Sequence, residues 1–322
     1  MTAKTDSPIQ TVGIAGRGAI GLLYGMQMRS GGVEPWYIAD EERVWRYRQD
    51  PVAVNGIPQI FRYLQPGTTG NESAGDSHAG PALDLVLIMT KASGLEGALE
   101  EIAPFVDNHT IILSCLNGIT SEEIVRQRYP GNTILRTIVQ GMDTVYLQGE
   151  CRYSHIGEIL TGSDGPGQET AVRQVKAFFD SIGMPCRICE DIVREQWNKL
   201  MLNCGVNQIC AVYGCGYAGA VGEHRALFVR VMEEVRQVAL ARGIHLGTED
   251  IDRWLTVCEA LDGASMPSMA QDIRAGRHTE LCLFSGTVVP MAGILGIPVP
   301  ELSRLQDQIL ALEAGMEQPS RP

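Results

Sequence analysis

Residues 195–207, EQWNKLMLNCGVN, combine one lysine with two asparagines at a spacing that could do chemistry. Written as a helix, Lys199, Asn203 and Asn207 fall four residues apart and therefore share one face. Apolar neighbours surround that face, so we expect the helix to be largely buried and its polar stripe to line a cleft. A lysine held among hydrogen-bonding side chains is suited to donating a proton. An amphipathic helix with a solvated stripe is the alternative.

The composition narrows the class of protein. At 322 residues the chain is long for one core, which favours two domains. A net charge of -12 argues against nucleic-acid binding, because neutralising phosphates needs an excess of Lys and Arg. The sequence has no apolar run long enough to cross a bilayer, and its first residues lack the apolar segment of a signal peptide. We therefore expect no membrane partner and a cytoplasmic location.

A glycine-rich turn follows the first apolar strand and begins an apolar helix. Gly16 permits the tight turn, Gly18 lets the backbone approach a pyrophosphate, and Gly21 lets helix and strand pack closely. Because a second strand follows at residues 36–39, the pattern predicts a nucleotide-binding Rossmann unit. A glycine-rich turn without a ligand is the alternative. The expected cofactor-binding residues of this turn are Gly16, Arg17, Gly18, Ala19, Ile20 and Gly21.

Asp40 closes the second strand, where an acidic side chain would accept hydrogen bonds from the adenosine ribose hydroxyls. With Glu41 and Glu42 it should repel a 2'-phosphate, which favours NADH over NADPH. The arginines within residues 43–48 are close enough to reach this position. An acidic surface turn is the alternative.

Two further strand ends carry polar residues. Residues 84–90 and 110–114 are apolar runs suited to buried parallel strands. Open α/β sheets bind ligands at the carboxyl ends of their strands, so Lys91 is placed to meet the cofactor or its phosphates. Asn117, in the segment LNGI, could hold a nicotinamide or a substrate oxygen. A surface lysine and an ordinary Asn-Gly turn are the alternatives.

The second half of the chain has helical patterns alone. Residues 67–81, rich in Gly and Ser, predict a surface loop, and the alternation of strand and helix stops near residue 185. We therefore expect an α/β Rossmann domain over residues 1–190 and an all-α domain over residues 191–322. Strands are also expected at 133–139 and 155–160, and helices at 169–182, at 223–242, from Thr248, from Pro267 and from Pro300.

Nine cysteines in a chain without an export signal indicate reduced thiols. Cys186 and Cys189 form a C-x-x-C, but no second pair has zinc spacing, so no metal site is expected. Neither a G-x-S-x-G elbow nor a P-loop occurs, which leaves hydrolysis and phosphoryl transfer without support.

Taken in order, G-R-G-A-I-G, L-N-G, W-N-K-L-x-x-N-C-x-x-N, S-M-A-Q-D-I and R-H-T-E resemble the ketopantoate reductase family (2-dehydropantoate 2-reductase) over nearly the whole chain. The resemblance implies an N-terminal Rossmann domain, a helical C-terminal domain, and a cleft between them that binds NADPH and a small 2-oxo acid. It favours the catalytic interpretation of Lys199 over a solvated stripe.

The resemblance also implies a role for each matching residue. Lys199 would donate the proton, and Glu280 would orient the cofactor ribose or Lys199. Ser268 would bind the substrate carboxylate, and Asn117 would lie between nicotinamide and substrate. The substrate-binding residues would be Asn117, Asn203, Asn207 and Ser268. An ammonium beside the ketone oxygen would both stabilise the charge that hydride addition creates there and protonate it.

Some positions depart from the family pattern. Asp40 stands where members that use NADPH usually carry a basic residue, so we expect NADH to be preferred. Tyr217, Cys282 and Ser285 replace polar residues frequent in the family, which leaves the 2-oxo acid open. We expect reduction of ketopantoate, a step of pantothenate biosynthesis, or of a related 2-oxo acid.

Two rival functions remain at this stage. An opine or β-hydroxyacid dehydrogenase has a similar two-domain plan, but the pairing of Ser268 and Glu280 with Lys199 argues against it. A non-catalytic dinucleotide-binding sensor would have no need of these residues together. The oligomeric state stays open, with a homodimer as one option.

Overall fold

A computed structural model describes residues 8–67 and 82–316. It divides into two compact units. Unit 1 comprises Met1–Leu116 and Ser121–Ile192, and unit 2 comprises Asn117–Thr120 and Val193–Pro322. The four residues Asn117–Thr120 thus group with unit 2, although the strand before them and the helix after them belong to unit 1. The surface loop expected at residues 67–81 lies outside the described residues, apart from its first position.

Unit 1 is built on an eight-stranded sheet of order β12-β11-β8-β7-β6-β1-β2-β5. All neighbouring strands are parallel except β8 and β11. β1, β6 and β7 are buried along their whole length, which explains their unbroken apolar sequences. The strands are β1 (Val12–Ala15), β2 (Trp36–Ile38), β5 (Arg62–Leu64), β6 (Leu85–Ile88), β7 (Ile111–Ser114), β8 (Thr133–Met142), β11 (Ile156–Gly162) and β12 (Cys186–Ile188).

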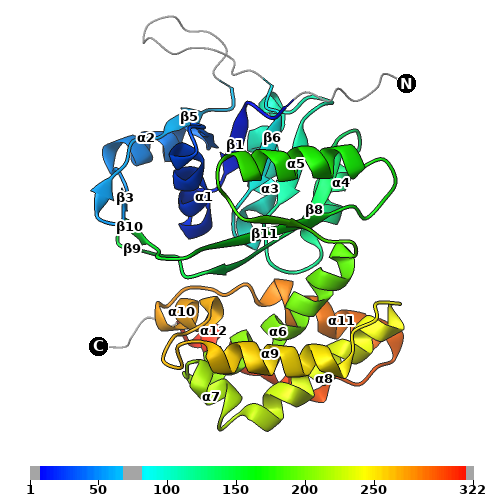
Figure 1. The fold of residues 1–322 in the computed structure, drawn as a ribbon. Coiled ribbons are helices and arrows are strands. Elements are labelled where there is room, and N and C mark those ends of the chain that lie inside the picture. Colours follow the sequence, from blue (N-terminus) through cyan, green and yellow to red (C-terminus); the bar gives the residue numbers. More distant parts are fainter. Residues whose placement is uncertain (1–7, 68–81, 317–322) are drawn as a thin grey trace, which may run out of the picture. The chain divides into compact units, whose positions relative to one another are not determined.

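Helices cover both faces of this sheet (Figure 1). One core cluster joins the sheet to α1 (Ala19–Ser30) and α5 (Glu169–Ser181), and a second joins it to α3 (Leu95–Ile102) and α4 (Ser121–Arg128). α2 (Glu41–Gln49) follows β2. Helices on both faces of a mostly parallel sheet confirm the α/β Rossmann class, which the glycine turn and the buried strands predicted.

A small second sheet of order β4-β3-β10-β9 also belongs to unit 1. Its strands were not predicted, since they have only two or three residues each and their sequences show no clear alternation. They are β3 (Ala53–Val54), β4 (Ile57–Pro58), β9 (Val145–Leu147) and β10 (Glu150–Arg152).

The expectation that only helices follow residue 185 was wrong at one element. β12 (Cys186–Ile188) pairs in parallel with β11 at the edge of the large sheet. This strand is too short for its periodicity to be read from the sequence. It contains Cys186 of the C-x-x-C, and burial raises the pKa of that thiol to about 12, so the thiolate that binds metals is disfavoured.

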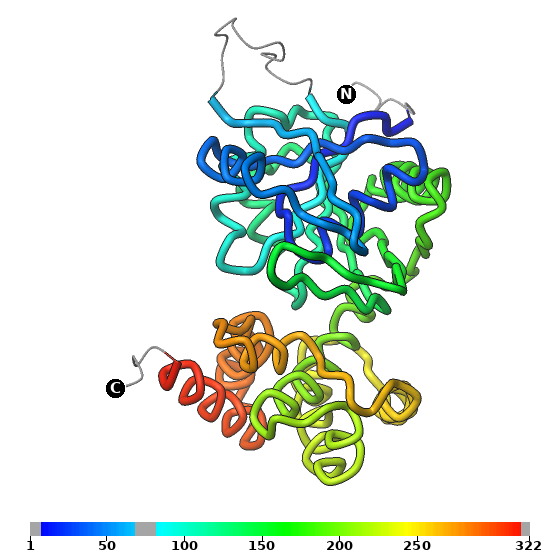
Figure 2. Tube along the Cα trace, turned by 90° about the vertical axis from the view of Figure 1, so that its left-hand side faces the viewer, coloured from blue at the N-terminus to red at the C-terminus, as the bar shows by residue number. Residues whose placement is uncertain are grey.

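Unit 2 is helical, and its course can be followed from green to red in Figure 2. α6 (Ile192–Tyr213) is its longest helix and is buried along much of its length. The helices after it are α7 (Tyr217–Val221), α8 (Arg225–Ala241), α9 (Thr248–Ala260), α10 (Ser268–Arg274), α11 (Ser285–Leu295) and α12 (Pro300–Met316). Among the residues that the structure covers, no helix combines the length and the apolar composition that a membrane span requires.

Candidate active site

The glycine turn of unit 1 has the geometry of a pyrophosphate cradle. Gly16 has φ +113°, and a Cβ there would lie 2.5 Å from the carbonyl oxygen of Met89. A Cβ on Gly21 would lie 2.0 Å from the carbonyl oxygen of Gly16. Both positions therefore require glycine, whereas nothing lies within 4 Å of a Cβ built on Gly18. Gly18 is the N-cap of α1 and supplies no side-chain cap, so the helix N-terminus is open to an anion.

Arg17, between Gly16 and Gly18 of this turn, contacts two tyrosines with its side chain. Its guanidinium carbon is 3.6 Å from the centre of the Tyr47 ring, and its Nη1 donates to the Tyr63 hydroxyl at 3.1 Å. Its Nε atom is buried and has no hydrogen-bond partner within residues 8–67 and 82–316. The arrangement places a fixed positive charge next to the glycine turn.

Asp40 has a structural task in addition to the expected ribose contact. It is the N-cap of α2, where one carboxylate oxygen accepts from the Arg43 backbone N–H at 2.7 Å and the other from Arg43 Nε at 2.8 Å. Burial raises the pKa of Asp40, but the hydrogen bonds from Arg43, together with the charges of Arg43 and Arg46, outweigh burial and lower that pKa. The side chain remains half-exposed and keeps lone pairs for a ligand. Its charge is nevertheless partly balanced by Arg43.

Lys91 is exposed and lies three residues after the end of β6, the strand beside β1 in the sheet. Since β1 and β6 are parallel, Lys91 and the glycine turn lie at the same edge of the sheet, as we expected from the sequence. Its carbonyl oxygen accepts from the backbone N–H of Gly94 and starts a short 3-10 turn.

In unit 2 the polar stripe of α6 is buried rather than solvated. Asn203 and Asn207 are 7% and 5% exposed, and Asn207 Nδ2 donates to Asn203 Oδ1 at 3.2 Å. Lys199, one turn earlier, is half-buried. Because apolar side chains such as Leu200 and Met201 are also buried, the helix is enclosed on several sides, and its amides depend on hydrogen bonds with each other.

A hydrogen-bonded chain links three residues that are far apart in the sequence. Lys199 Nζ donates to Asn117 Oδ1 at 3.1 Å, and Asn117 Nδ2 donates to Glu280 Oε2 at 3.4 Å. The Asn117 carboxamide therefore connects an ammonium with a carboxylate, and its two ends face the partners that suit them. Gly118, the next residue, has φ +86°, and a Cβ there would lie 3.0 Å from the Leu283 carbonyl oxygen.

The residue before Lys199 anchors α6 and was not singled out in the sequence. Asn198 is fully buried. Its Oδ1 accepts from Trp254 Nε1 at 2.7 Å, and its Nδ2 donates to Asp250 Oδ1 at 3.4 Å. Arg194 forms an ion pair with the same carboxylate at 2.6 Å. These bonds fix how α6 is rotated against α9, which determines where Lys199 points. The only sequence signal is a polar residue at a helical position otherwise occupied by core residues.

Ser268 is not joined to the α6 stripe. It is the exposed first residue of α10 and makes no hydrogen bond to Lys199, Asn203 or Asn207 within the described parts of the chain. Its role in binding a carboxylate stays a prediction.

Ser285 and Tyr217 belong to the packing of unit 2. Ser285 is fully buried and donates to Gln208 Oε1 at 2.6 Å. Gln208 in turn donates to the Cys204 carbonyl oxygen at 2.7 Å. Ser285 therefore holds α11 against α6. The backbone N–H of Tyr217 donates to the Ser265 carbonyl oxygen at 3.1 Å, and burial raises the pKa of Tyr217 to about 12.

Among the residues described, no group of three or more His, Cys, Asp or Glu side chains could hold a metal ion.

Comparison with known proteins gives consistent matches. The family model described as "Ketopantoate reductase PanE/ApbA" matches residues 12–163, and "Ketopantoate reductase PanE/ApbA C terminal" matches residues 191–313. A 2-dehydropantoate 2-reductase of Streptococcus pyogenes is 25% identical over 313 residues, which cover 94% of this chain and 97% of that protein.

Solved structures share the fold. The ternary structure of D-mandelate dehydrogenase with NADH and anilino(oxo)acetate has a TM-score of 0.81 at 22% identity, covering 96% of this chain and all of the other. A dimeric ketopantoate reductase from Staphylococcus aureus has a TM-score of 0.76 at 16% identity, covering 95% of this chain and 99% of the other.

Proposed function

The chain belongs to the ketopantoate reductase family and is an oxidoreductase that acts on CH-OH groups, and on this premise we propose that it reduces a 2-oxo acid to a 2-hydroxy acid. Ketopantoate is the first candidate substrate, since the matched family models and the curated relative carry that name. The observation that carries the proposal is the chain Lys199–Asn117–Glu280, in which an ammonium is held by hydrogen bonds in a half-buried setting.

The nucleotide cofactor fits the residues of unit 1. The glycines at 16, 18 and 21 leave room for a pyrophosphate at the N-terminus of α1, and Lys91 supplies a cation at the same sheet edge. When bound, the reduced nicotinamide supplies the hydride. We propose that Asp40 accepts hydrogen bonds from the ribose hydroxyls and makes NADH the preferred cofactor, because its half-exposed carboxylate would repel a 2'-phosphate.

We propose that Lys199 donates the proton that the ketone oxygen takes up. The ketone oxygen gains negative charge as the hydride adds to its carbon, and an ammonium at hydrogen-bond distance stabilises that charge and then protonates it. Asn117 holds Lys199 through its Oδ1 atom. Glu280 accepts from the Nδ2 atom and thereby fixes which end of the carboxamide faces the lysine. Glu280 acts on Lys199 through Asn117 in this scheme.

The remaining polar residues of unit 2 are proposed to bind the substrate. The side chains of Asn203 and Asn207, one and two turns along α6 from Lys199, are hydrogen-bonded to each other. Carboxamide N–H groups of this kind suit the oxygens of a 2-oxo acid. Ser268 is proposed to bind the carboxylate. For the assembly we propose a homodimer, in line with the dimeric relative.

Steady-state oxidation of NADH and of NADPH, each with ketopantoate and with a panel of other 2-oxo acids that includes phenylglyoxylate, tests the function. Turnover of ketopantoate with NADH favoured supports both the substrate and the role of Asp40. Turnover of another 2-oxo acid alone keeps the mechanism and replaces the substrate. Binding of cofactor without any turnover would overturn the proposal in favour of a dinucleotide-binding sensor.

A further inference from the structure

Asn117 lies on a short loop whose two ends are tied together. Residues 115–120 connect β7 to α4. At the first end, the Cys115 backbone N–H donates to the Ile88 carbonyl oxygen at 2.9 Å and continues the strand pairing. Across the base of the loop, the hydroxyl of Ser114, the last residue of β7, donates to the hydroxyl of Ser121, the first residue of α4, at 2.8 Å.

The bond between the two serines is buried. Ser114 is 0% exposed and Ser121 is 2% exposed. Ser121 Oγ in turn donates a hydrogen bond to Glu122 Oε2 at 3.2 Å, and Glu122 is also buried. Each hydroxyl therefore has a definite donor direction, which a solvated serine would not have. Removing either hydroxyl would leave the other one buried without its partner, which is destabilising.

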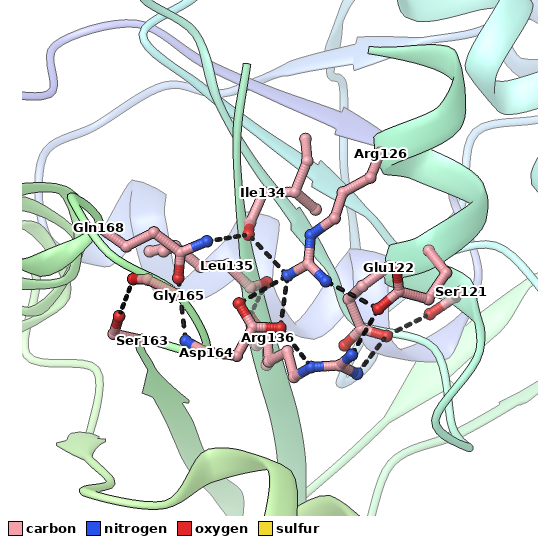
Figure 3. A network of polar contacts seen from close by, with 12 residues as sticks. Ser121, Glu122, Arg126, Ile134, Leu135, Arg136, Ser163, Asp164, Gly165 and Gln168 are labelled. Atoms are coloured by element: carbon pink, nitrogen blue, oxygen red, sulfur yellow. Dashed lines mark hydrogen bonds and ion pairs between the residues drawn. The ribbon is translucent and has the colours of Figure 1, made fainter. Parts of the chain in front are cut away.

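Ser114, Ser121 and Glu122 form a clamp. Ser121 and Glu122 connect it to a charged network (Figure 3). Arg136 of β8 approaches Glu122 Oε2 with Nη1 at 3.9 Å and binds Asp164 Oδ2 with Nε at 2.6 Å. Arg126 of α4 binds the same Asp164 oxygen at 2.7 Å. Because β8, α4 and the segment after β11 all contribute, the base of the loop is fixed by more than the local backbone.

We propose that Ser121 is a positioning residue for Asn117, acting through its bond with Ser114. This inference rests on the proposed function of Asn117 as the support of the proton donor. The carboxamide must keep two partners at once, at 3.1 Å to Lys199 and 3.4 Å to Glu280, and the second distance is already longer than is usual for a hydrogen bond. A small shift of the loop breaks one of them, and misplacement by about 1 Å can lower a rate about a hundredfold.

The inference predicts that Ser121→Ala loosens the hold on Lys199. In this variant the hydrogen bond from Lys199 Nζ to Asn117 Oδ1 should be lost. The Lys199 amine should then react about fivefold faster with acetic anhydride at a fixed pH, since one hydrogen bond contributes about 1 kcal/mol. Peptide mass spectrometry after brief acetylation measures this at Lys199 and, as internal references, at the other lysines. This readout does not depend on turnover. In the same variant, kcat should fall about tenfold while the dissociation constant of the cofactor is unchanged.

Ser163→Ala is the matched control. Ser163 Oγ donates to the Gly165 carbonyl oxygen at 2.7 Å, in the same network but at its other end (Figure 3). It should leave both Lys199 labelling and kcat at the wild-type level. The double variant Ser114→Ala/Ser121→Ala removes both hydroxyls, so it should regain stability relative to either single variant while labelling stays fast and kcat stays low.

Wild-type labelling at Lys199 in a folded Ser121→Ala variant would overturn the inference, whatever the turnover. Equal effects in Ser163→Ala would also overturn it, because they would reflect general loosening of unit 1. If wild-type protein turns over no 2-oxo acid, the proposed function fails, and the labelling result still decides the role of Ser121.

Discussion

Lys199 donates a hydrogen bond to the side-chain oxygen of Asn117 at 3.1 Å, although 81 residues separate them in the chain. The other end of the same carboxamide donates to Glu280. An amide cannot reverse its orientation here without facing its oxygen to the carboxylate and its NH2 group to the ammonium. The proton donor is therefore held in one direction by a neutral residue that has only one acceptable orientation.

Asn117→Ala should lower kcat about tenfold, since it removes one hydrogen bond to the catalytic lysine, and each 1.4 kcal/mol corresponds to a factor of ten. Steady-state kinetics at saturating cofactor measure it. Asn132→Ala is a suitable control, because Asn132 Nδ2 makes two comparable bonds, to the Asp107 and Thr110 carbonyl oxygens, within unit 1. Equal losses of kcat in both variants would contradict a special role for Asn117.

Gly18→Ala separates cofactor binding from folding. Gly18 has φ -86° and nothing within 4 Å of a new Cβ, so the melting temperature should change little. The methyl group would nevertheless occupy space that a pyrophosphate needs, and the dissociation constant of NADH should rise by at least about tenfold. Fluorescence titration with NADH measures it.

Gly21→Ala supplies the contrast to that variant. Its Cβ would lie 2.0 Å from the Gly16 carbonyl oxygen, so both folding stability and cofactor binding should fall. Unchanged NADH affinity in Gly18→Ala would mean that the turn is not the cofactor cradle.

Asp40→Asn tests the charge without removing the cap, because Asn and Asp are similar N-caps. The ratio of NADPH to NADH affinity should rise, and the melting temperature should stay close to that of the wild type. Asp40→Arg should shift the ratio further, but it also loses the cap of α2 and should cost about 1 kcal/mol of stability. A constant affinity ratio across the three proteins would show that Asp40 does not contact the ribose.

Asp164→Asn should destabilise unit 1 by about 2 kcal/mol at pH 7, because it removes the more buried of the two carboxylates that Arg126 and Arg136 share, the other being that of Glu123. Burial raises the pKa of Asp164, but the two arginines outweigh it and hold that pKa below its ordinary value. The stabilisation by these two ion pairs is therefore complete above about pH 3.9, which is the pKa of Asp in an unfolded chain. It is lost as the pH falls through the lowered pKa of Asp164 in the folded protein.

Urea unfolding of both proteins between pH 3 and 8 measures this difference. We expect a constant gap in unfolding free energy above pH 5 that narrows toward pH 3. A gap that is independent of pH throughout would contradict the assigned ion pairs.

Patterns that depend on neighbouring residues could be predicted from the sequence. The glycine turn, the buried strands β1, β6 and β7, and the polar stripe of α6 each follow from spacing within a few residues. They gave the fold class and the face that carries Lys199. The short strands of the second sheet and β12 could not be predicted, because two or three residues do not establish a period.

Long-range contacts account for the rest. The contact between Asp40 and Arg43 is local, and the sequence places arginines within reach, but it does not decide whether an acidic residue before a helix serves as cap or as ligand. Asn117 could be placed at the end of a strand, but its bonds to Lys199 and Glu280 join residues of unit 2 that are far apart in the sequence, and no local pattern shows them. Asn198 and Ser121 have no sequence signal apart from being polar at buried positions.

The most direct test of the central claim is the turnover of Lys199→Ala with the best 2-oxo acid, measured beside Lys176→Ala. Lys176 is a surface residue of α5 that pairs with Asp180, so its loss should leave kcat unchanged. Lys199→Ala should lower kcat about a hundredfold or more and keep the wild-type affinity for the cofactor, because general acid catalysis contributes that much. Near-normal turnover in Lys199→Ala would contradict the account.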